Sequence, residues 1–386
     1  MLKLLTKPVE NNTHQKYTKR LNKYSASFID LKTIKDYNYI MAKVKSKWIC
    51  QQCGYESAGY LGKCPECGSW GSFTEEIQSG IKPQNISPQG IANDSKPSLI
   101  NDIHIGEEVR ISTNISEFDR ILGGGLVQGS LVLIAGDPGI GKSTILLQTS
   151  GELAKNGQKI LYVSAEESAS QLKLRANRLG INSDNLYVYP QTNLESIRKQ
   201  IEELNPDTIV VDSIQAIYSQ TITSSAGSVS QIRECCNILM QIAKTQNITI
   251  IIIGHVTKDG NIAGPKILEH MVDTVISFEG DKYKSYRMLR SMKNRFGNTS
   301  EVGIFEMQTH GLVEVRNPNE LFLNERSQDA IPGSAIIVTN EGTRPLLVEI
   351  QALVGTTPYP TPRRVTNELI QADCYKFLLY LKNGWG

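Results

Sequence analysis

The segment GDPGIGKS, residues 136–143, has the residue types and spacing of a phosphate-binding loop. It fits the pattern G-x-x-x-x-G-K-[ST], in which glycines let backbone N–H groups turn toward phosphate oxygens. In that pattern the lysine reaches the β- and γ-phosphates and the hydroxyl ligates Mg²⁺. The segment therefore predicts ATP and Mg²⁺ as cofactors, bound by Gly136, Asp137, Pro138, Gly139, Ile140, Gly141, Lys142, Ser143 and Thr144.

Acidic residues end two apolar runs that follow this loop. TIVVD (208–212) ends in Asp212, which we expect to share the Mg²⁺ with Ser143. A helix N-cap is the structural alternative for this acid. LYVSAEES (161–168) contains the pair Glu166–Glu167. A carboxylate at a strand tip can polarise the attacking water, so we predict Glu166 as the base, with Lys142 as a second catalytic residue. Glu167 competes for that role, and an acid pair that simply starts a helix is the alternative.

Two Cys-x-x-Cys pairs, each followed by glycine, lie upstream of the loop. Four thiolates fit a closed tetrahedral Zn²⁺ site that leaves no catalytic position open, whereas a redox pair or free thiols are the alternatives. A segment of about 30 residues cannot build an adequate core, so the metal must supply the folding free energy. We therefore predict structural Zn²⁺ bound by Cys50, Cys53, Cys64 and Cys67.

The elements that must position these residues follow from the apolar pattern. Runs rich in Val and Ile alternate with amphipathic stretches, and near-continuous apolar strands between helices indicate a mainly parallel sheet buried on both faces. This predicts a three-layered α/β fold. The expected strands are 131–135, 159–163, 186–189, 208–212, 248–253 and 274–278, and the expected helices are 142–156, 167–179, 194–204 and 228–246.

Bulk composition limits the classes of protein that remain. A net charge of +2 neither demands nor excludes nucleic acid, so any basic surface must be local. No apolar run approaches the roughly 20 residues that span a membrane, and no secretory signal is evident. We expect a cytoplasmic protein without a membrane partner. In that reducing compartment paired cysteines bind metal more often than they form disulfides.

Basic residues and a histidine recur in two later segments. His255 ends an apolar run and can sense a γ-phosphate, although a packed core histidine explains it as well. Lys258 and Lys266 follow in a loop that can grip a nucleic-acid backbone or can simply be solvated surface. Lys293 and Arg295 share one side of an alternating stretch. At a subunit boundary, such a pair can reach a neighbour's γ-phosphate as an arginine finger does.

Several motifs occur in one order along the chain: the CxxC…CPECG clamp, LGGGLVQGS, GDPGIGKSTILLQ, VDSIQ, GHVTKDGNIAGPKILEHMVD and KNRFG. Together they resemble the RadA (Sms) family of bacterial DNA repair proteins, from about residue 41 to residue 364. KNRFG and GHVTKDG carry the most specific part of this resemblance, whereas the phosphate loop alone is widespread.

The resemblance implies a RecA-like ATPase that assembles as a homo-hexameric ring on single-stranded DNA. In this family, ATP hydrolysis drives branch migration of recombination intermediates beside the RecA recombinase. By motif match, Lys142, Ser143 and Asp212 take the nucleotide and Mg²⁺ roles, and Glu166 falls at the catalytic acid. Lys293 and Arg295 match the motif needed for activity and DNA handling, and Lys258 and Lys266 fall in a DNA-binding loop.

The domain organisation follows from composition and resemblance together. We expect a basic extension at 1–45, a zinc finger at 46–75, a linker at 76–110 and the ATPase domain at 111–316. The first forty residues are expected to be dispensable or a misassigned start. Residues 317–386 resemble the opening strands of a Lon-protease-like domain and depart from it after residue 364, so we expect an incomplete, naturally shortened or frameshifted domain with impaired assembly.

Two alternative functions remain open at this point. A KaiC-like signalling ATPase shares the GGGL turn and the phosphate loop, although the zinc clamp and KNRFG argue against it. A zinc-containing adaptor that binds nucleotide with impaired turnover is the second alternative. For the zinc finger itself, Lys43, Lys45, Lys47 and Lys63 with Trp48, Tyr55 and Tyr60 offer charge and stacking surfaces for single strands. A lysine-rich flank that only aids solubility is the alternative.

Overall fold

A computed structural model describes residues 45–78, 99, 110–255, 267–280, 285–317, 333–341, 343–352 and 355–356. The predicted basic extension, most of the linker, and Lys258 and Lys266 lie outside the described residues. Among those that are described, no helix is long and apolar enough to cross a membrane.

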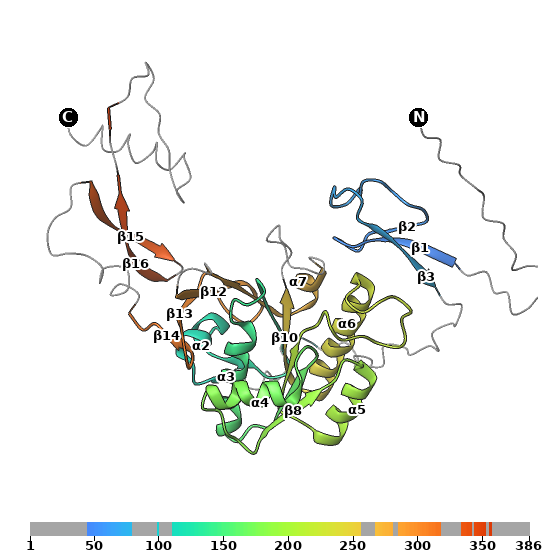
Figure 1. Ribbon diagram of the computed structural model, residues 1–386, viewed down its shortest axis with the longest axis horizontal. Helices are drawn as coiled ribbons and strands as arrows, with labels where there is room; N and C mark the ends of the chain where they lie inside the picture. Colours follow the sequence, from blue (N-terminus) through green and yellow to red (C-terminus); the bar gives the residue numbers. More distant parts are fainter. Residues whose placement is uncertain are drawn as a thin grey trace, which may run out of the picture.

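The centre of the molecule is a nine-stranded sheet with the order β14-β13-β12-β11-β6-β10-β9-β7-β8 (Figure 1). Neighbours from β11 to β8 pair in parallel, and β12, β13 and β14 extend the sheet in antiparallel fashion. The mainly parallel α/β fold predicted from the apolar runs is confirmed. The strands are β6 (Leu131–Gly136), β7 (Ile160–Ser164), β8 (Leu186–Pro190), β9 (Thr208–Asp212), β10 (Thr249–His255), β11 (Thr274–Glu279), β12 (Tyr286–Asn294), β13 (Val302–Gln308) and β14 (Gly311–Glu314).

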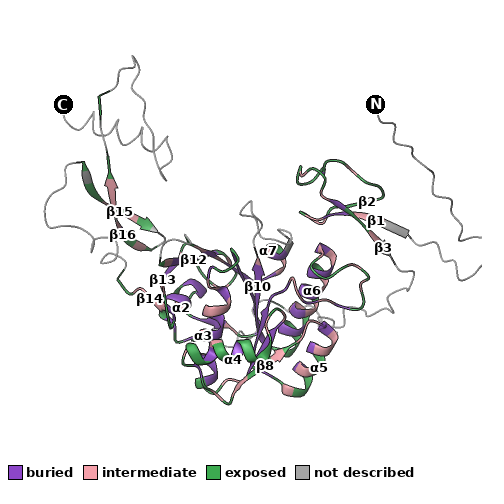
Figure 2. Ribbon diagram, viewed as in Figure 1, coloured by how far each residue is buried: buried purple, intermediate pink, exposed green. Residues whose placement is uncertain are grey.

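Helices cover both faces of this sheet, because alternate strand residues point to opposite faces and both sets are apolar. On one face, side chains such as Ile134 and Val210 pack with α2 (Ser116–Leu122), α3 (Lys142–Lys155) and α4 (Ala169–Arg178). On the other, Leu133 and Val211 pack with α5 (Leu194–Leu204), α6 (Val229–Gln246) and α7 (Ile267–Met271). Figure 2 shows the resulting buried centre. Each fully buried Leu or Ile contributes about 1.5–3 kcal/mol relative to exposure.

One predicted strand differs from the expectation of burial on both faces. β8 is the last strand of the sheet, and Tyr187 and Val188 are 41% and 37% exposed. Its apolar run resembles those of the inner strands, because one face of β8 still packs against α3 and α4. A strand that pairs on one side only is half-solvated, and the sequence does not encode which run occupies that position.

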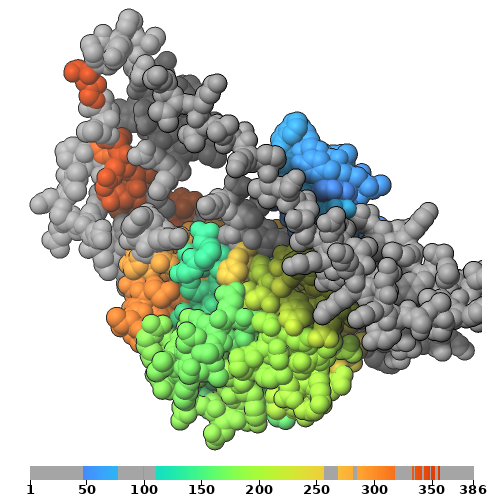
Figure 3. Space-filling model, turned by 45° about the vertical axis from the view of Figure 1, so that its right-hand side comes forward, coloured from blue at the N-terminus to red at the C-terminus, as the bar shows by residue number. Residues whose placement is uncertain are grey.

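The cysteine module is a small antiparallel sheet of order β2-β1-β3. Its strands are β1 (Lys45–Cys50), β2 (Glu56–Ser57) and β3 (Phe73–Gln78). The third strand thus runs three residues past 75, the end of the predicted zinc finger. In Figure 3 the module, in blue, projects from the rounded body of the ATPase domain.

Two further pairs of strands flank the ATPase core. β4 (Arg110–Ile111) pairs with β5 (Leu126–Val127), and β15 (Ser334–Glu341) forms a hairpin with β16 (Arg344–Gln351). The hairpin contacts the core through Leu346, which is buried with Val302 and Ile304. The Lon-like character expected of residues 317–386 stays a prediction, because this hairpin is the only secondary structure in their described part.

Candidate nucleotide and zinc sites

The parallel strands bring the predicted catalytic residues to one edge of the sheet. In the register, His255 lies opposite Gly136, and Ser164 lies opposite Asp212, so four strands end side by side. The phosphate loop follows β6, and Glu166 follows β7. Ligands of open α/β sheets bind outside the carboxyl ends of the strands. The order β6-β10-β9-β7 therefore places loop, histidine, aspartate and glutamate together at this edge of the sheet, the nucleotide edge.

The loop itself needs glycine at two positions for different reasons. A Cβ on Gly136 would lie 2.5 Å from the carbonyl oxygen of Phe278 on β11, so only glycine fits between the strands. Gly139 has open space around it but a φ of 78°, which L-residues rarely adopt. The chain then enters α3 at Lys142, whose first turn presents unpaired N–H groups suited to an anion.

Lys142 is folded back onto this loop. Its Nζ donates to the carbonyl oxygens of Gly136 and Asp137, each at 2.8 Å, and the residue is 4% exposed. Burial lowers the pKa of Lys142 to about 8, although the nearby carboxylates of Asp212, Asp137 and Glu166 oppose that shift. The ammonium therefore has carbonyl partners that phosphate oxygens can replace.

Asp212 is held at the end of β9 by a buried tyrosine. The hydroxyl of Tyr162, on β7, donates to Asp212 Oδ2 at 2.9 Å, and both residues are buried. Burial raises the pKa of Asp212, against hydrogen bonds from Ser143 and Tyr162 that lower it. A buried carboxylate beside the Ser143 hydroxyl supplies two oxygen ligands of the kind that Mg²⁺ prefers, so the residues present fit the ion.

Glu166 and Glu167 have different surroundings. Glu166 Oε1 accepts the hydroxyl hydrogen of Ser213 at 2.5 Å and lies 3.2 Å from His255 Nε2. Its side chain is 47% exposed. Glu167 instead forms an ion pair with Arg175 of α4. Of the two acids, Glu166 is therefore partly exposed beside His255, whereas Glu167 is bound to the adjoining helix.

Sequence reasoning missed three residues that hold this site. Tyr162 and Ser213 support the two acids, and the guanidinium of Arg287, on β12, donates from Nε to the loop carbonyl of Ile140 at 3.2 Å. Arg287 is 7% exposed, unusual for an arginine. The serine directly after Asp212 and the tyrosine within an apolar run were the available signals, because polar groups that enter a core need partners.

Lys293 and Arg295 contact α7 and the residues directly after it. Lys293 Nζ donates to the carbonyl oxygens of Glu269 and Val272, each at 2.8 Å, and Arg295 Nη1 lies 3.2 Å from Asp273 Oδ1. In the sheet, Lys293 pairs with Val275 of β11, and Val275 pairs with Leu133 of β6, the strand that leads into the phosphate loop.

The four cysteines converge as the spacing predicted. Their sulfur atoms all lie within 4.8 Å of one another, with Cys50 Sγ 3.7 Å from Cys67 Sγ and Cys53 Sγ 3.5 Å from Cys64 Sγ. A tetrahedral Zn²⁺ with Zn–S bonds of about 2.3 Å requires sulfurs about 3.8 Å apart. The donor set therefore fits zinc. Each pair is tightened by a backbone bond from the following glycine, Gly54 to Cys50 and Gly68 to Cys64.

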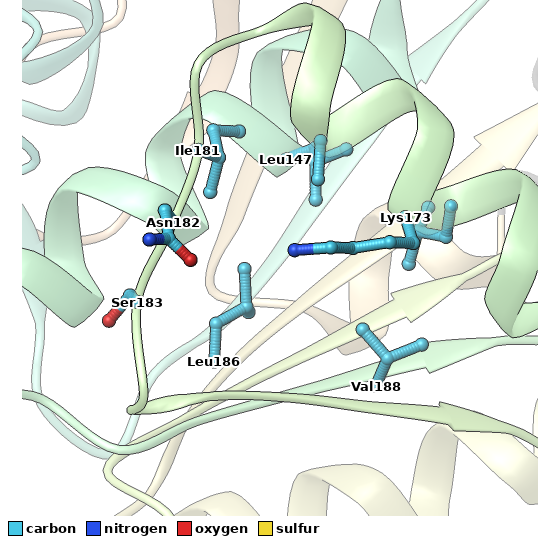
Figure 4. Close-up of a pocket in the computed structure, with 9 residues that line it drawn as sticks. Leu147, Lys173, Ile181, Asn182, Ser183, Leu186 and Val188 are labelled. Carbon is cyan, nitrogen blue, oxygen red and sulfur yellow. The ribbon is translucent and has the colours of Figure 1, made fainter.

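A separate hollow is lined by none of the residues at the sheet edge described above. It is enclosed by α3, α4 and the start of β8, and Lys173 extends across it with Asn182 and Ser183 at its rim (Figure 4). Its wall is apolar, formed by Leu147, Leu172, Ala176, Ile181, Leu186 and Val188. None of the predicted nucleotide-binding residues lines it.

Comparisons with known proteins agree with both sites. Residues 106–261 match the AAA domain family, and residues 48–75 match a rubredoxin metal-binding domain. A KaiC-like protein from Pyrococcus horikoshii is 22% identical, with a TM-score of 0.46 over 54% of this chain and 99% of that protein. The fold, the nucleotide edge and the four-cysteine cluster define a P-loop ATPase with an N-terminal zinc ribbon.

Curated relatives narrow this class. The chain is 55% identical over 327 residues to the DNA repair protein RadA of Bacillus subtilis, covering 84% of this chain and 71% of that protein. RadA of Listeria monocytogenes is 54% identical at the same coverage, and RadA of Streptococcus pyogenes is 53% identical over 330 residues. The chain belongs to the RadA family of DNA repair proteins.

Proposed function

We propose that this protein is a DNA-dependent ATPase of recombinational repair, which binds single-stranded DNA and promotes branch migration of recombination intermediates. The observation that supports this most is the convergence of Lys142, Asp212 and Glu166 at one sheet edge in a chain of the RadA family. A nucleotide-binding edge with a carboxylate at its rim is the arrangement that triphosphate hydrolysis needs.

In this proposal each residue has a separate task. The loop N–H groups from Gly136 to Ser143 cradle the phosphates, and Lys142 exchanges its two carbonyl partners for phosphate oxygens. Ser143 and Asp212 hold the Mg²⁺, which neutralises developing negative charge when it is bound. Glu166 accepts a proton from the attacking water, and Glu167 is occupied by Arg175.

ATP hydrolysis is proposed to be coupled to DNA binding through the residues that follow His255 along the chain. His255 contacts Glu166, and the next residues along the chain lead through Lys258 and Lys266 to α7. A single strand that binds these lysines would therefore act on a segment that begins beside the catalytic carboxylate. Cation contacts to a strand's phosphates give affinity without sequence preference, as a branch-migration activity requires.

Assembly into a hexameric ring would give Lys293 and Arg295 a second role. In the single chain they bind backbone carbonyls and Asp273, and Arg295 is 55% exposed. At a subunit boundary, the same cations are proposed to reach the neighbour's triphosphate and stabilise its transition state. The free-chain contacts then hold both side chains in place until a neighbour binds.

The zinc ribbon is proposed to bind a partner protein, with the RecA recombinase as the candidate. Residues 45–78 contain three lysines and four glutamates, so the ribbon does not attract a phosphate backbone by net charge. Trp70 is 77% exposed and Tyr60 is 55% exposed. Exposed aromatic side chains of this kind are enriched at protein–protein interfaces.

Phosphate release with and without single-stranded DNA tests this function, with Lys142→Ala as the matched control. We expect hydrolysis that single strands stimulate, and its loss by at least about 10³-fold in the variant, since a γ-phosphate contact is missing in the transition state. Hydrolysis indifferent to DNA would instead favour a signalling ATPase. Nucleotide binding without turnover would favour an adaptor, and either result would overturn the proposal.

A further inference from the structure

Ser213 directly follows the predicted magnesium ligand Asp212 and is fully buried. Its hydroxyl donates to Glu166 Oε1 at 2.5 Å, which joins the end of β9 to the connection that follows β7. A buried hydroxyl needs a hydrogen-bond partner, and that of Ser213 has the predicted catalytic carboxylate.

The backbone around Ser213 is fixed on both sides. The N–H of Ile214 donates to the carbonyl of Ile253 on β10 at 3.0 Å, and the carbonyl of Ser213 accepts the N–H of Ala216 at 3.2 Å. Glu166, in contrast, lies in the connection between β7 and α4. The bond therefore ties the partly exposed side chain of Glu166 to a segment whose backbone is hydrogen-bonded to β10.

Both described contacts of this carboxylate involve the same oxygen. Ser213 and His255 approach Oε1, at 2.5 Å and 3.2 Å. The bonds fix the plane of the carboxylate and leave Oε2 for a water proton. A general base must lie within hydrogen-bond reach of the proton it accepts, and a displacement of about 1 Å can cost about 10²-fold in rate.

We propose that Ser213 is a positioning residue that orients Glu166 for water activation, a role that rests on the proposed catalytic function of Glu166. The hydroxyl acts in two ways. It restricts the side chain to one orientation, and it favours the ionised carboxylate, the only form that can accept a proton.

The charges around Glu166 allow these two effects to be measured. Burial raises the pKa of Glu166, but hydrogen bonds from Ser213 and His255 and the charge of Lys142 lower it below its usual value. Asp212, on β9, is the acidic neighbour. Removal of the Ser213 hydroxyl takes away a contact that lowers the pKa, so the Glu166 pKa rises and the acid limb of kcat moves to higher pH.

Ser213→Ala tests the inference, and Ser219→Ala is its matched control. Ser219 is equally buried and also donates its hydroxyl to a glutamate, Glu195 of α5 at 2.6 Å, which is not one of the predicted site residues. We expect Ser213→Ala to lower kcat about 10- to 100-fold with KM for ATP changed less than about 3-fold. We also expect its acid limb to shift upward by about one pH unit, and Ser213→Thr, which keeps the hydroxyl, to recover most of the activity. Ser219→Ala should keep the normal rate.

Measurements in the Glu166→Gln variant separate the positioning role of Ser213 from the catalytic role of Glu166. If Ser213 acts through Glu166, Ser213→Ala lowers the residual single-turnover rate of Glu166→Gln less than 2-fold, because the group it positions is already lost. An undiminished 10-fold effect in that background, or an unshifted acid limb, would overturn the positioning role. A normal rate in Glu166→Gln alone would overturn the catalytic assignment of Glu166 instead. Retained ATP binding shows that each variant is folded.

Discussion

The nucleotide edge and the zinc ribbon hold their functional residues in opposite ways. At the nucleotide edge, a sheet buried on both faces exists before any ligand binds, and it places Lys142 and Asp212 by its register. In the described ribbon, two of the four buried apolar residues, Cys50 and Cys64, are themselves predicted metal ligands, beside Ile49 and Phe73. The ATPase domain therefore folds and forms its site without a ligand, whereas the ribbon folds only when its site holds the metal.

The largest expected effect follows from zinc removal. A structural Zn²⁺ supplies about 10–16 kcal/mol in small zinc modules, more than four buried side chains provide. We expect a strong chelator to unfold residues 45–78 completely while ATP still binds to the ATPase domain. Trp48 and Trp70, two of the three tryptophans, report the ribbon by fluorescence. A ribbon that keeps its fold without metal, or ATP binding that disappears with the metal, would contradict the comparison.

A smaller effect tests how much the contact with the C-terminal hairpin stabilises the ATPase domain. Arg344 Nη1 lies 2.7 Å from Glu117 Oε2, and the side chains are 13% and 5% exposed. Arg344→Ala leaves the buried Glu117 with only the N–H of Ile304 and the more distant Arg120 as described partners, so we expect a loss of about 3 kcal/mol in the free energy of unfolding. Lys199→Ala breaks an exposed ion pair with Glu203 and should cost less than about 0.5 kcal/mol in the same denaturant titration. Equal effects would show that the hairpin contributes nothing to the core.

The smallest predicted effect concerns proton uptake at the nucleotide edge. Burial lowers the pKa of Lys142 to about 8 in the free protein, whereas bound phosphate favours the ammonium and raises that pKa. Binding therefore takes up a proton above pH 8, and the Kd for ATP should increase up to about tenfold per pH unit beyond that point. Calorimetry in buffers of different ionisation enthalpy measures the uptake directly. A Kd that stays constant from pH 7 to 9.5 would show that Lys142 is already fully protonated.

Many features of both regions could be predicted from the sequence, because they depend on local patterns. Apolar runs mark strands wherever burial is two-sided, and a glycine-rich loop between a strand and a helix identifies a phosphate site. The spacing of the four cysteines likewise fixed the donor set of the ribbon. Such signals lie within short windows of the chain, so a single sequence contains them.

Contacts between distant segments could not be predicted in the same way. Ser213 meets Glu166 only because β7 and β9 are neighbours, and Arg344 meets Glu117 across 227 positions. Strand order decides such pairs, and apolar periodicity does not encode strand order. The same limit explains β8, whose composition matches that of an inner strand although it lies at the edge, and Lys293, whose carbonyl partners belong to a different element.

The central claim is that Glu166, and not Glu167, activates water at an edge that binds ATP. Parallel measurements of MgATP affinity and single-turnover hydrolysis in Glu166→Gln and Glu167→Gln test it most directly. We predict that Glu166→Gln binds ATP with nearly unchanged affinity and hydrolyses it about 10²- to 10⁴-fold more slowly, while Glu167→Gln hydrolyses it within about threefold of the normal rate. A normal hydrolysis rate in Glu166→Gln, or a greater loss in Glu167→Gln, would contradict the account.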